Sequence, residues 1–359
     1  MREQYPHRRR PHRRSPYGLI LAAVVLVALV AGGIYLLVRS SGSSGASSAE
    51  VCNATSVANT VLPSVVKISA NGATGAGTGS GEVIRSDGYI LTNNHVISDA
   101  AHGGHLSVLF SDGTEVDAAL TGRDPQTDLA VLKVTPPFDL KVIAIGSSGN
   151  VKVGQPVVAL GAPLGLDGTV TSGIISALDR NIHVPGDNGG TALLVSAIQT
   201  DAAINPGNSG GALVNCDNQL VGVPTAGAVM PNGGGGNIGL GFAIPVDSAM
   251  QIANDLIEHG SVTHSYFGLA TVPIPDSASE QAGTPAGLFV QGLAPGGPAA
   301  QAGLHVGDVI TKIDGQTAVN NVQIERLTLT KRPGDTVDVT YSRDGQSHDA
   351  TITLGASPD

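Results

Sequence analysis

Short hydrophobic runs separated by turn residues characterise the chain from about Val57 onward. The runs contain many β-branched residues, and helical periodicity between them is weak. They occupy residues 65–68, 82–84, 89–91, 106–110, 129–134, 157–160, 220–223 and 241–244. Turn sequences such as Ser-Asp-Gly at residues 86–88 and 111–113 separate some of them. Short strands at this spacing predict a β-barrel or a β-sandwich.

One stretch in the middle of the chain has the period of a helix instead. Apolar residues recur at helical spacing from Val246 to His259, and Gly260 follows as a stop signal. We interpret this segment as a helix that closes the domain before it. The chain then becomes rich in proline from Val272 to Pro285, and β-like runs resume up to Leu354. A domain boundary is therefore expected near Ser261.

An uncharged run of 21 residues, Gly18 to Val38, lies near the start of the chain. This is about the length of a helix that crosses a bilayer. Six arginines precede the run and Arg39 follows it, so the positive-inside rule predicts a cytoplasmic N-terminus and an extracytoplasmic remainder. A cleaved signal peptide is the alternative, although its hydrophobic region usually has about 7–15 residues. We expect a retained single-pass anchor in the cell membrane, followed by a flexible tether rich in Ser and Gly.

Composition and charge restrict the class of protein further. Aromatic residues make up 3% of the chain and tryptophan is absent, so the cores must consist largely of Val, Ile, Leu and Ala. Residues 1–40 carry a net charge of +6, and removing them from the total of −10 leaves −16 for the remainder. Nucleic-acid binding needs a basic surface, so the acidic body argues against a nucleic-acid partner.

The two cysteines, Cys52 and Cys216, fall in the part of the chain that the predicted topology places in an oxidising compartment. Pairing is permitted there, but the sequence alone does not establish that the two residues are close. A bond between them would link the start of the folded region to a point just past Ser209, with a loop-closure stabilisation of roughly 4–5 kcal/mol. Two free, buried thiols are the alternative.

A glycine-rich turn around Ser209 is the first candidate for chemistry. In residues 205–211 (Asn-Pro-Gly-Asn-Ser-Gly-Gly), small residues flank a serine that a tight turn can present as a nucleophile. Such a serine needs a base and a carboxylate that orients the base. His95 lies at the end of an apolar strand and Asp128 at the start of another; either residue alone could be purely structural. The order His95, Asp128, Ser209 is that of chymotrypsin-like enzymes.

Three segments resemble the catalytic blocks of the HtrA (Deg) serine proteases, namely residues 92–96, 127–134 and 199–213. The similarity continues through residues 239–245 and covers roughly Val57 to Leu354. It implies a mainly β protein with two six-stranded barrels of the chymotrypsin type and the active site between them.

The same resemblance assigns roles to individual residues. His95 would be the general base, Asp128 would orient it, and Ser209 would attack the peptide carbonyl. Gly207, Asn208 and Ser209 would form the oxyanion hole, with the backbone N–H groups of Gly207 and Ser209 as donors.

The specificity pocket is expected to be apolar. Asp201 lies eight residues before Ser209. The base of the pocket in trypsin-like enzymes lies nearer six residues before the nucleophile, which is Ala203 here. Ile204 and Leu240 are therefore the expected lining, and the pocket should accept small aliphatic side chains.

The region from Gly287 to Leu354 is similar to the PDZ domains that follow HtrA proteases, and one copy is present. PDZ domains add a peptide as a β-strand and capture its terminal carboxylate with backbone N–H groups. The loop that corresponds to the carboxylate-binding loop of PDZ domains consists of Tyr266, Phe267, Gly268 and Leu269. The alternative interpretation of this segment is an ordinary start of a strand.

Two further patterns receive no functional assignment. The alternating glycines of residues 73–81 suggest a nucleotide loop, but neither a strand-to-helix unit nor a P-loop lysine accompanies them. His102 and His105 have a spacing that a metal could use, yet no third ligand is evident, so we interpret them as loop histidines. No metal, nucleotide or other cofactor is expected.

The expected organisation is a basic cytoplasmic tail (1–17), a transmembrane helix (18–38), a flexible linker (39–56), a chymotrypsin-like protease domain (57–261) and a PDZ domain (262–357). The expected function is cleavage of misfolded or unfolded extracytoplasmic polypeptides, with peptide C-termini bound at the PDZ domain. The family resemblance also implies a homotrimer. Two alternatives stay open: a chaperone or binding module with a latent protease, and a role of the arginine-rich tail in binding anionic lipid.

Overall fold

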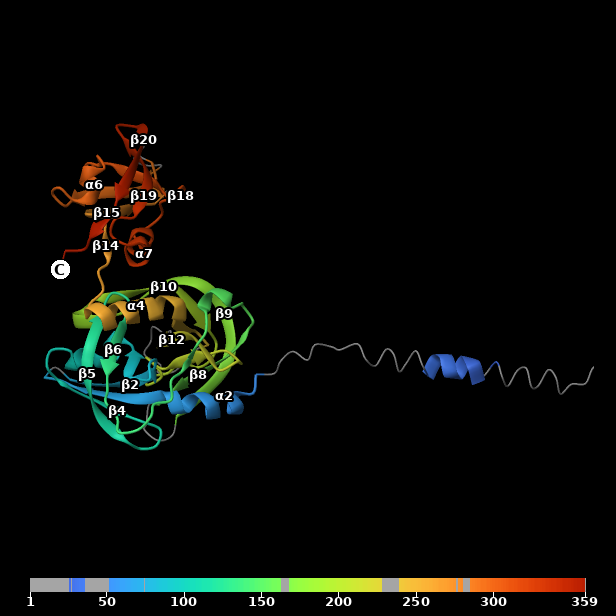
Figure 1. Cartoon of the computed structure of the whole chain (residues 1–359). Helices are drawn as coiled ribbons and strands as arrows, with labels where there is room; N and C mark the ends of the chain where they lie inside the picture. The colour runs from blue at the N-terminus through green and yellow to red at the C-terminus, as the bar shows by residue number, and fades with distance from the viewer. Residues whose placement is uncertain are drawn as a thin grey trace, which may run out of the picture. The chain divides into compact units, whose positions relative to one another are not determined.

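The computed structural model describes residue 26 and residues 28–35, 52–73, 75–162, 168–227, 239–275, 277–279 and 285–358. The chain divides into two compact units, Met1–Val51 and Cys52–Asp359. The second unit contains all of the predicted β-rich regions (Figure 1).

The first unit contains a part of the predicted membrane span. Leu26 and residues 28–35 are helical, and their large apolar side chains are exposed. Among the residues described, no helix combines the length and the hydropathy that a membrane crossing requires. The rest of the predicted span 18–38 and the whole basic tail 1–17 lie outside the described residues.

The second unit begins with helix α2 (Ala54–Val61). Asn53 caps this helix, because its side chain accepts a hydrogen bond of 3.1 Å from the backbone N–H of Ser56. The buried face of the helix carries Val57 and Val61. The predicted linker 39–56 is therefore too long at its C-terminal end, since the capping side chain lets the helix begin before the first hydrophobic run.

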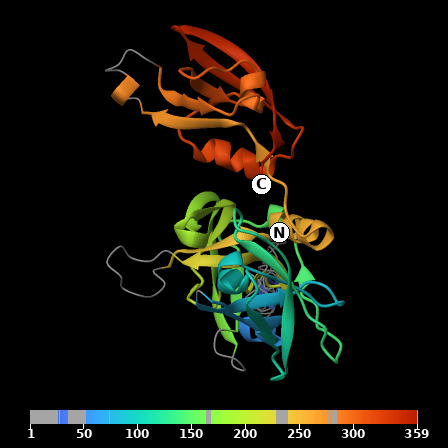
Figure 2. The same cartoon turned by 90° about the vertical axis from the view of Figure 1, so that its left-hand side faces the viewer.

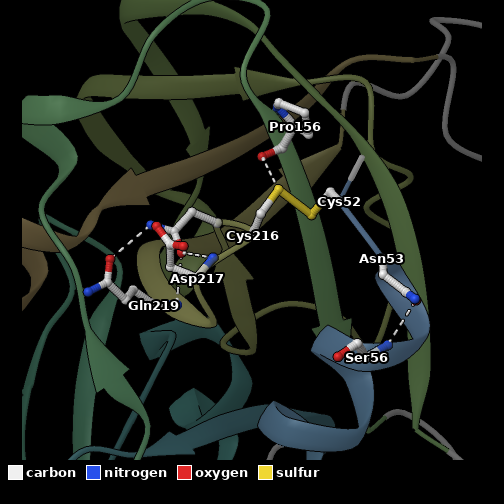
Figure 3. The surroundings of a disulfide bond; sticks show 8 residues. Cys52, Asn53, Ser56, Pro156, Cys216, Asp217 and Gln219 are labelled. Carbon is white, nitrogen blue, oxygen red and sulfur yellow. Dashed lines mark hydrogen bonds between the residues drawn. A yellow bond between two sulfur atoms is a disulfide. The ribbon is translucent and has the colours of Figure 1, made fainter. Parts of the chain in front are cut away.

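A disulfide bond joins Cys52 to Cys216 (Figure 3). The two Cα atoms are 5.1 Å apart although 164 residues separate them in sequence. Cys216 lies in the turn between strands β11 (Ala212–Val214) and β12 (Gln219–Gly227). The bond therefore ties the segment that leads into α2 to the strand pair that follows Ser209.

Six antiparallel strands form a closed first barrel in the order β1-β2-β3-β6-β5-β4. Alternate residues of β1, namely Val66, Ile68 and Ala70, point into the barrel, as a period of two requires. The strands are β1 (Val65–Asn71), β2 (Ala76–Val83), β3 (Tyr89–Thr92), β4 (His105–Leu109), β5 (Glu115–Asp124) and β6 (Leu129–Lys133). Short helices η1 (Leu62–Ser64), α3 (Asn94–Ile97) and η2 (Ser98–Ala100) flank them.

A second barrel follows in the order β11-β8-β9-β10-β13-β12. An additional pairing between β11 and β12 joins the two ends of this order into a ring of six strands, and the short β7 pairs with β12 in parallel. The further elements are β7 (Ala144–Ile145), η3 (Ser148–Asn150), β8 (Pro156–Gly161), β9 (Thr169–Pro185), η4 (Asp187–Gly189), β10 (Thr191–Thr200) and β13 (Gly241–Pro245). Both barrels have the six strands that the sequence resemblance implied.

A shared hydrophobic cluster fills the junction of the two barrels. Leu91 and Leu129 of the first barrel pack in it with Leu160 and Val214 of the second, and all four are fully buried. Burial of each such side chain is worth about 1.5–3 kcal/mol. Helix α4 (Val246–His259) covers this cluster with its apolar face, and Gly260 ends the helix in the left-handed region at φ 77°. The predicted closing helix is confirmed with the same bounds.

The C-terminal module, residues 265–356, has a sheet and a core of its own (Figures 1 and 2). Its main sheet has the order β15-β16-β17-β19-β20, with β18 paired to β17, and β14 pairs with β21. The strands are β14 (Ser265–Tyr266), β15 (Leu269–Ile274), β16 (Gly287–Leu293), β17 (Val309–Ile313), β18 (Gln316–Thr317), β19 (Thr336–Arg343), β20 (Gln346–Thr353) and β21 (Gly355–Ala356), and the helices are α6 (Pro298–Gln301) and α7 (Val322–Thr330).

Candidate active site

His95 and Asp128 form a hydrogen-bonded pair at the edge of the first barrel. His95 lies on α3, directly after β3, and Asp128 lies directly before β6, the strand that pairs with β3. The Nδ1 atom of His95 is 2.9 Å from Oδ2 of Asp128, and its backbone N–H donates to Oδ1 over 2.9 Å. The side chain of Asp128 is 2% exposed and that of His95 is 36% exposed. The pair thus has a buried carboxylate and a ring that substrate can reach.

The turn that carries Asp128 is held by a second buried carboxylate, Asp124. Thr127 donates its hydroxyl to Asp124 over 2.5 Å, and the backbone N–H of Gln126 donates over 3.2 Å. The ring of His264 is 2.9 Å from the same carboxylate. Asp128 itself has φ 57°, which few non-glycine residues adopt. The Asp124 contacts explain how the turn maintains this conformation.

The pKa of His95 is raised above its ordinary value. Burial by itself lowers the pKa, because it disfavours the charged ring. The hydrogen bond and the charge of Asp128 act in the opposite direction, and the charge of Asp187 adds to them. The carboxylates outweigh the burial, so His95 is a stronger base than a free imidazole.

Ser209 lies on the predicted tight turn of the second barrel. Its hydroxyl donates a hydrogen bond of 3.2 Å to the backbone carbonyl of Thr225. Within the described part of the chain, no hydrogen bond joins Ser209 to His95. The hydroxyl of Thr225 in turn donates to Oδ2 of Asp128. Thr225 therefore contacts both Ser209 and Asp128.

Two backbone N–H groups on the Ser209 turn have no acceptor in the part of the chain that the structure describes. Gly207 has φ 98°, a conformation that glycine adopts at low cost. The N–H of Asn208 donates to the carbonyl of Asn205 over 3.0 Å. Those of Gly207 and Ser209 donate to no acceptor among the described residues. Of the predicted oxyanion-hole residues, these two thus carry the available donors.

The nucleophile turn rests on Ser80 of the first barrel. The Ser80 hydroxyl donates to the carbonyl of Gly207 over 2.6 Å, and its backbone N–H donates to the carbonyl of Ser209 over 2.9 Å. Thr92 donates its hydroxyl to the Ser80 carbonyl over 2.7 Å. The two bonds of Ser80 to the nucleophile turn cross from one barrel to the other, and the bond from Thr92 ties Ser80 to β3 within the first barrel. Together they set the position of Ser209 relative to the strand that leads to His95.

The predicted pocket residues differ in their surroundings. Ile204 is 3% exposed and packs in the core of the second barrel, while Leu240 is partly exposed. Asp201 accepts a hydrogen bond of 2.7 Å from the backbone N–H of Ile174, so its carboxylate is engaged in holding β9.

The predicted carboxylate-binding loop lies between β14 and β15. Phe267 is buried in the module core, and Gly268 has φ 72°. The carbonyls of these two residues accept hydrogen bonds from Ala299 and Ala294. Their N–H groups have no partner among the residues described.

Several residues of the site were not identified from the sequence. Thr225, Ser80 and Arg123 lie outside the recognised motifs, and no local pattern distinguishes them from ordinary strand residues. Arg123 belongs to the site because its guanidinium pairs with Asp187 over 2.5 Å. Asp187 lies in a hairpin turn, where aspartate is common. Within the described residues, no group of three or more His, Cys, Asp or Glu is arranged to hold a metal.

Comparison with known proteins agrees with this geometry. Residues 79–223 match the family described as a trypsin-like peptidase domain, and residues 264–354 match the PDZ domain. The two barrels with His95, Asp128 and Ser209 at their junction thus define a trypsin-like serine peptidase fold followed by one PDZ domain.

The chain belongs to the HtrA-type family of serine proteases. It is similar to the HtrA-type protease AlgW with decapeptide, with a TM-score of 0.70 and 33% identity over 86% of this chain and 99% of that one. It is 41% identical to serine protease PepD of Mycobacterium tuberculosis over 83% of this chain and 65% of PepD. It is also 42% identical to a probable periplasmic serine endoprotease DegP-like of Halomonas elongata, over 78% of this chain and 57% of that protein. The chain therefore spans somewhat less than two thirds of the length of these two curated relatives.

Proposed function

We propose that this chain is a serine endopeptidase that cleaves misfolded or unfolded polypeptides outside the cytoplasm. The observation that carries the proposal is the junction of the two barrels, where a raised-pKa His95 paired with buried Asp128 lies in the same site as Ser209. The names of the relatives support it, because PepD is called a serine protease and the DegP-like protein a periplasmic serine endoprotease.

In the proposed reaction, the Oγ atom of Ser209 bonds to the carbonyl carbon of the scissile peptide while His95 accepts the hydroxyl proton. Asp128 holds the ring orientation and stabilises the imidazolium. The C–N bond then breaks, and His95 returns the proton to the leaving amine. Water hydrolyses the acyl-enzyme by the same route. Before attack, the Ser209 side chain must rotate from the Thr225 carbonyl toward His95.

The negative oxygen of the tetrahedral intermediate would bind to the N–H groups of Gly207 and Ser209. Both groups lie on the turn that Ser80 supports, and neither has a partner among the described residues. Each donor of this kind contributes a factor of about 10²–10³ in rate.

Substrate selection would involve two regions. We propose that Ile204 and Leu240 favour small aliphatic side chains next to the scissile bond. We also propose that the loop Tyr266–Leu269 binds the C-terminal carboxylate of a peptide, since the N–H groups of Phe267 and Gly268 are open to a ligand within the described residues. An amidated peptide should then bind the PDZ domain more weakly than the same peptide with a free carboxylate.

The chain is further proposed to be anchored by residues 18–38 and to form a homotrimer. The uncharged run and the arginines before it support the anchor, and the family resemblance supports the trimer. Resistance of the membrane-bound chain to carbonate extraction tests the anchor. Sedimentation of the detergent-solubilised chain tests the trimer.

The decisive experiment compares the full-length chain with its Ser209→Ala variant. Purified protein is incubated with unfolded casein and, separately, with a fluorophosphonate probe that labels activated serines. The wild-type chain should cleave casein and take up one probe molecule, and the variant should do neither. Ser111→Ala, in an exposed turn, is the matched control and should behave as the wild type.

Casein cleavage that is equal in the wild type and in Ser209→Ala would overturn the proposal. Probe labelling at a serine other than Ser209 would overturn the assignment of the nucleophile.

A further inference from the structure

The hairpin of β9 and β10 extends beyond the second barrel and reaches the first. Its register shifts between Leu194 and Thr200, and beyond these irregularities the two strands continue to a tip at η4. On the way, the backbone N–H of Leu193 donates to the carbonyl of Gln126 over 3.1 Å. Gln126 belongs to the turn that carries Asp128, so the hairpin lies against the catalytic part of the first barrel.

Asp187 at this tip forms a closed hydrogen-bond network with two residues of the first barrel. Its Oδ1 accepts from Nδ2 of Asn94 over 2.9 Å, and its Oδ2 accepts from Nη1 of Arg123 over 2.5 Å. The same Nη1 donates to Oδ1 of Asn94 over 3.2 Å. The side chains of Arg123 and Asp187 are 21% and 16% exposed, and Asn94 is 1% exposed. Because each side chain bonds to both others, the three hold one another in a single arrangement.

Asn94 connects this network to the general base. It directly precedes His95, and its backbone N–H donates to the carbonyl of Asp128 over 3.1 Å. Asn93 donates to the same carbonyl with its side chain over 2.8 Å. A change at Asp187 therefore acts, through one buried side chain, on the turn that orients both His95 and Asp128.

Asp187 also acts on His95 through its charge. Burial, the largest influence, lowers the pKa of His95; the hydrogen bond and charge of Asp128 raise it, and the charge of Asp187 raises it further. The charged groups that face this part of the site are the carboxylates of Asp128 and Asp187 and the guanidinium of Arg123, which is bonded to Asp187.

We propose that Asp187 is a positioning residue for the peptidase reaction: held by Arg123 and Asn94, it fixes the turn that carries His95 and supplies a second negative charge near the imidazole. This inference rests on the proposed function, because it assigns His95 the role of the base. It makes the tip of the second-barrel hairpin a part of the catalytic apparatus of the first barrel.

The test uses the Asp187→Asn variant of the full-length chain, which keeps the shape of the side chain and removes its charge. The matched control is Asp117→Asn, because Asp117 is an 89% exposed carboxylate on β5, the strand that also carries Arg123. For each protein, kcat and KM for a peptide substrate are measured against pH. Asp187→Glu, which retains the charge, is the rescue variant.

In Asp187→Asn, the acidic limb of kcat/KM should move to lower pH by a few tenths of a unit up to about one unit, because one of two carboxylates that favour the imidazolium is lost. The plateau of kcat should fall about 3- to 10-fold through misplacement of His95, with little change in KM. Asp117→Asn should match the wild type. In Asp187→Glu, the acidic limb of kcat/KM should lie close to its position in the wild type.

A second readout does not depend on catalysis. The pKa of His95 is followed by NMR of histidine-labelled protein, with the signal assigned by its absence in His95→Gln. It should fall in Asp187→Asn and stay unchanged in Asp117→Asn. An unchanged His95 titration and acidic limb would overturn the inference, and so would a loss of kcat that only parallels a loss of folded protein. Absence of Ser209-dependent cleavage in the wild type would instead refute the proposed function, while the titration still decides the role of Asp187.

Discussion

The hydroxyl of Thr225 donates a hydrogen bond to the buried carboxylate of Asp128, and the carbonyl of Thr225 accepts one from the hydroxyl of Ser209. One residue of β12 thus contacts the groups at both ends of the proposed triad. Thr225→Val keeps the shape and the carbonyl but removes the donor to Asp128. Because a hydrogen bond to a charged group is worth about 1.5–3 kcal/mol, we expect kcat to fall roughly 10- to 100-fold. Steady-state cleavage of a peptide substrate measures this, and Thr225→Ser should restore most of the rate.

Glu82 on β2 gives a prediction about pH and stability. It is fully buried between Val65 and Leu91 on the neighbouring strands, and both of its carboxylate oxygens lack partners among the described residues. Burial raises the pKa of Glu82 well above its ordinary value. The folded state therefore keeps the proton while the unfolded chain loses it. The contribution of Glu82 to stability is fully present below the ordinary pKa of glutamate and is lost as pH rises toward the folded-state pKa.

Glu82→Gln removes this dependence. Below about pH 4 the variant and the wild type should have similar unfolding free energies. Between the ordinary pKa of glutamate and the folded-state pKa of Glu82, the unfolding free energy of the variant should rise relative to that of the wild type by roughly 1.4 kcal/mol for each pH unit. Urea unfolding followed by circular dichroism from about pH 3 to about pH 8 measures the difference. The control Glu258→Gln changes an exposed glutamate on α4 and should leave the pH dependence as it is. Parallel pH profiles for wild type and Glu82→Gln would contradict the prediction.

The disulfide between Cys52 and Cys216 should stabilise the second unit by closing a long loop. For a loop of this length, the entropic estimate is about 5 kcal/mol. We expect Cys216→Ser to lower the urea midpoint strongly, and reductant should lower that of the wild type by a similar amount. Cys52→Ser and the double variant should resemble Cys216→Ser, since each removes the same bond. Additive losses in the double variant would show that the thiols act separately.

Gly210 cannot accept a side chain at the nucleophile turn. Its φ is 75°, and a Cβ atom there would collide with the Thr92 hydroxyl and the Ser80 carbonyl. Gly154 has a similar φ of 86°, but nothing lies within 4 Å of the place where its Cβ would be. Both alanine substitutions should lower the free energy of unfolding by about 1–2 kcal/mol, because alanine is strained in the left-handed region. Only Gly210→Ala should also lose most of its kcat, because the collision displaces Ser209. Equal kcat in the two variants would contradict this account.

Local sequence patterns were sufficient for the elements that depend on local physics. The alternating runs predicted barrel strands, and helix α4 begins and ends where its periodicity and Gly260 indicated. The predicted flexible linker extended too far, to residue 56, because Asn53 caps a helix that begins at Ala54 and that the hydrophobic pattern does not predict.

The chain by itself determined the class of fold, the closing helix and the identity of His95, Asp128 and Ser209 as candidates, since turn chemistry and hydrophobic period are read from neighbouring residues. Only the tertiary structure decided which distant side chains complete the site. Thr225 meets Asp128 across 97 residues, Asp187 meets Arg123 across 64, and Cys52 meets Cys216 across 164. Such contacts depend on how distant segments pack in the folded chain. The sequence around a threonine, an aspartate or a cysteine does not indicate which distant residue its side chain will contact.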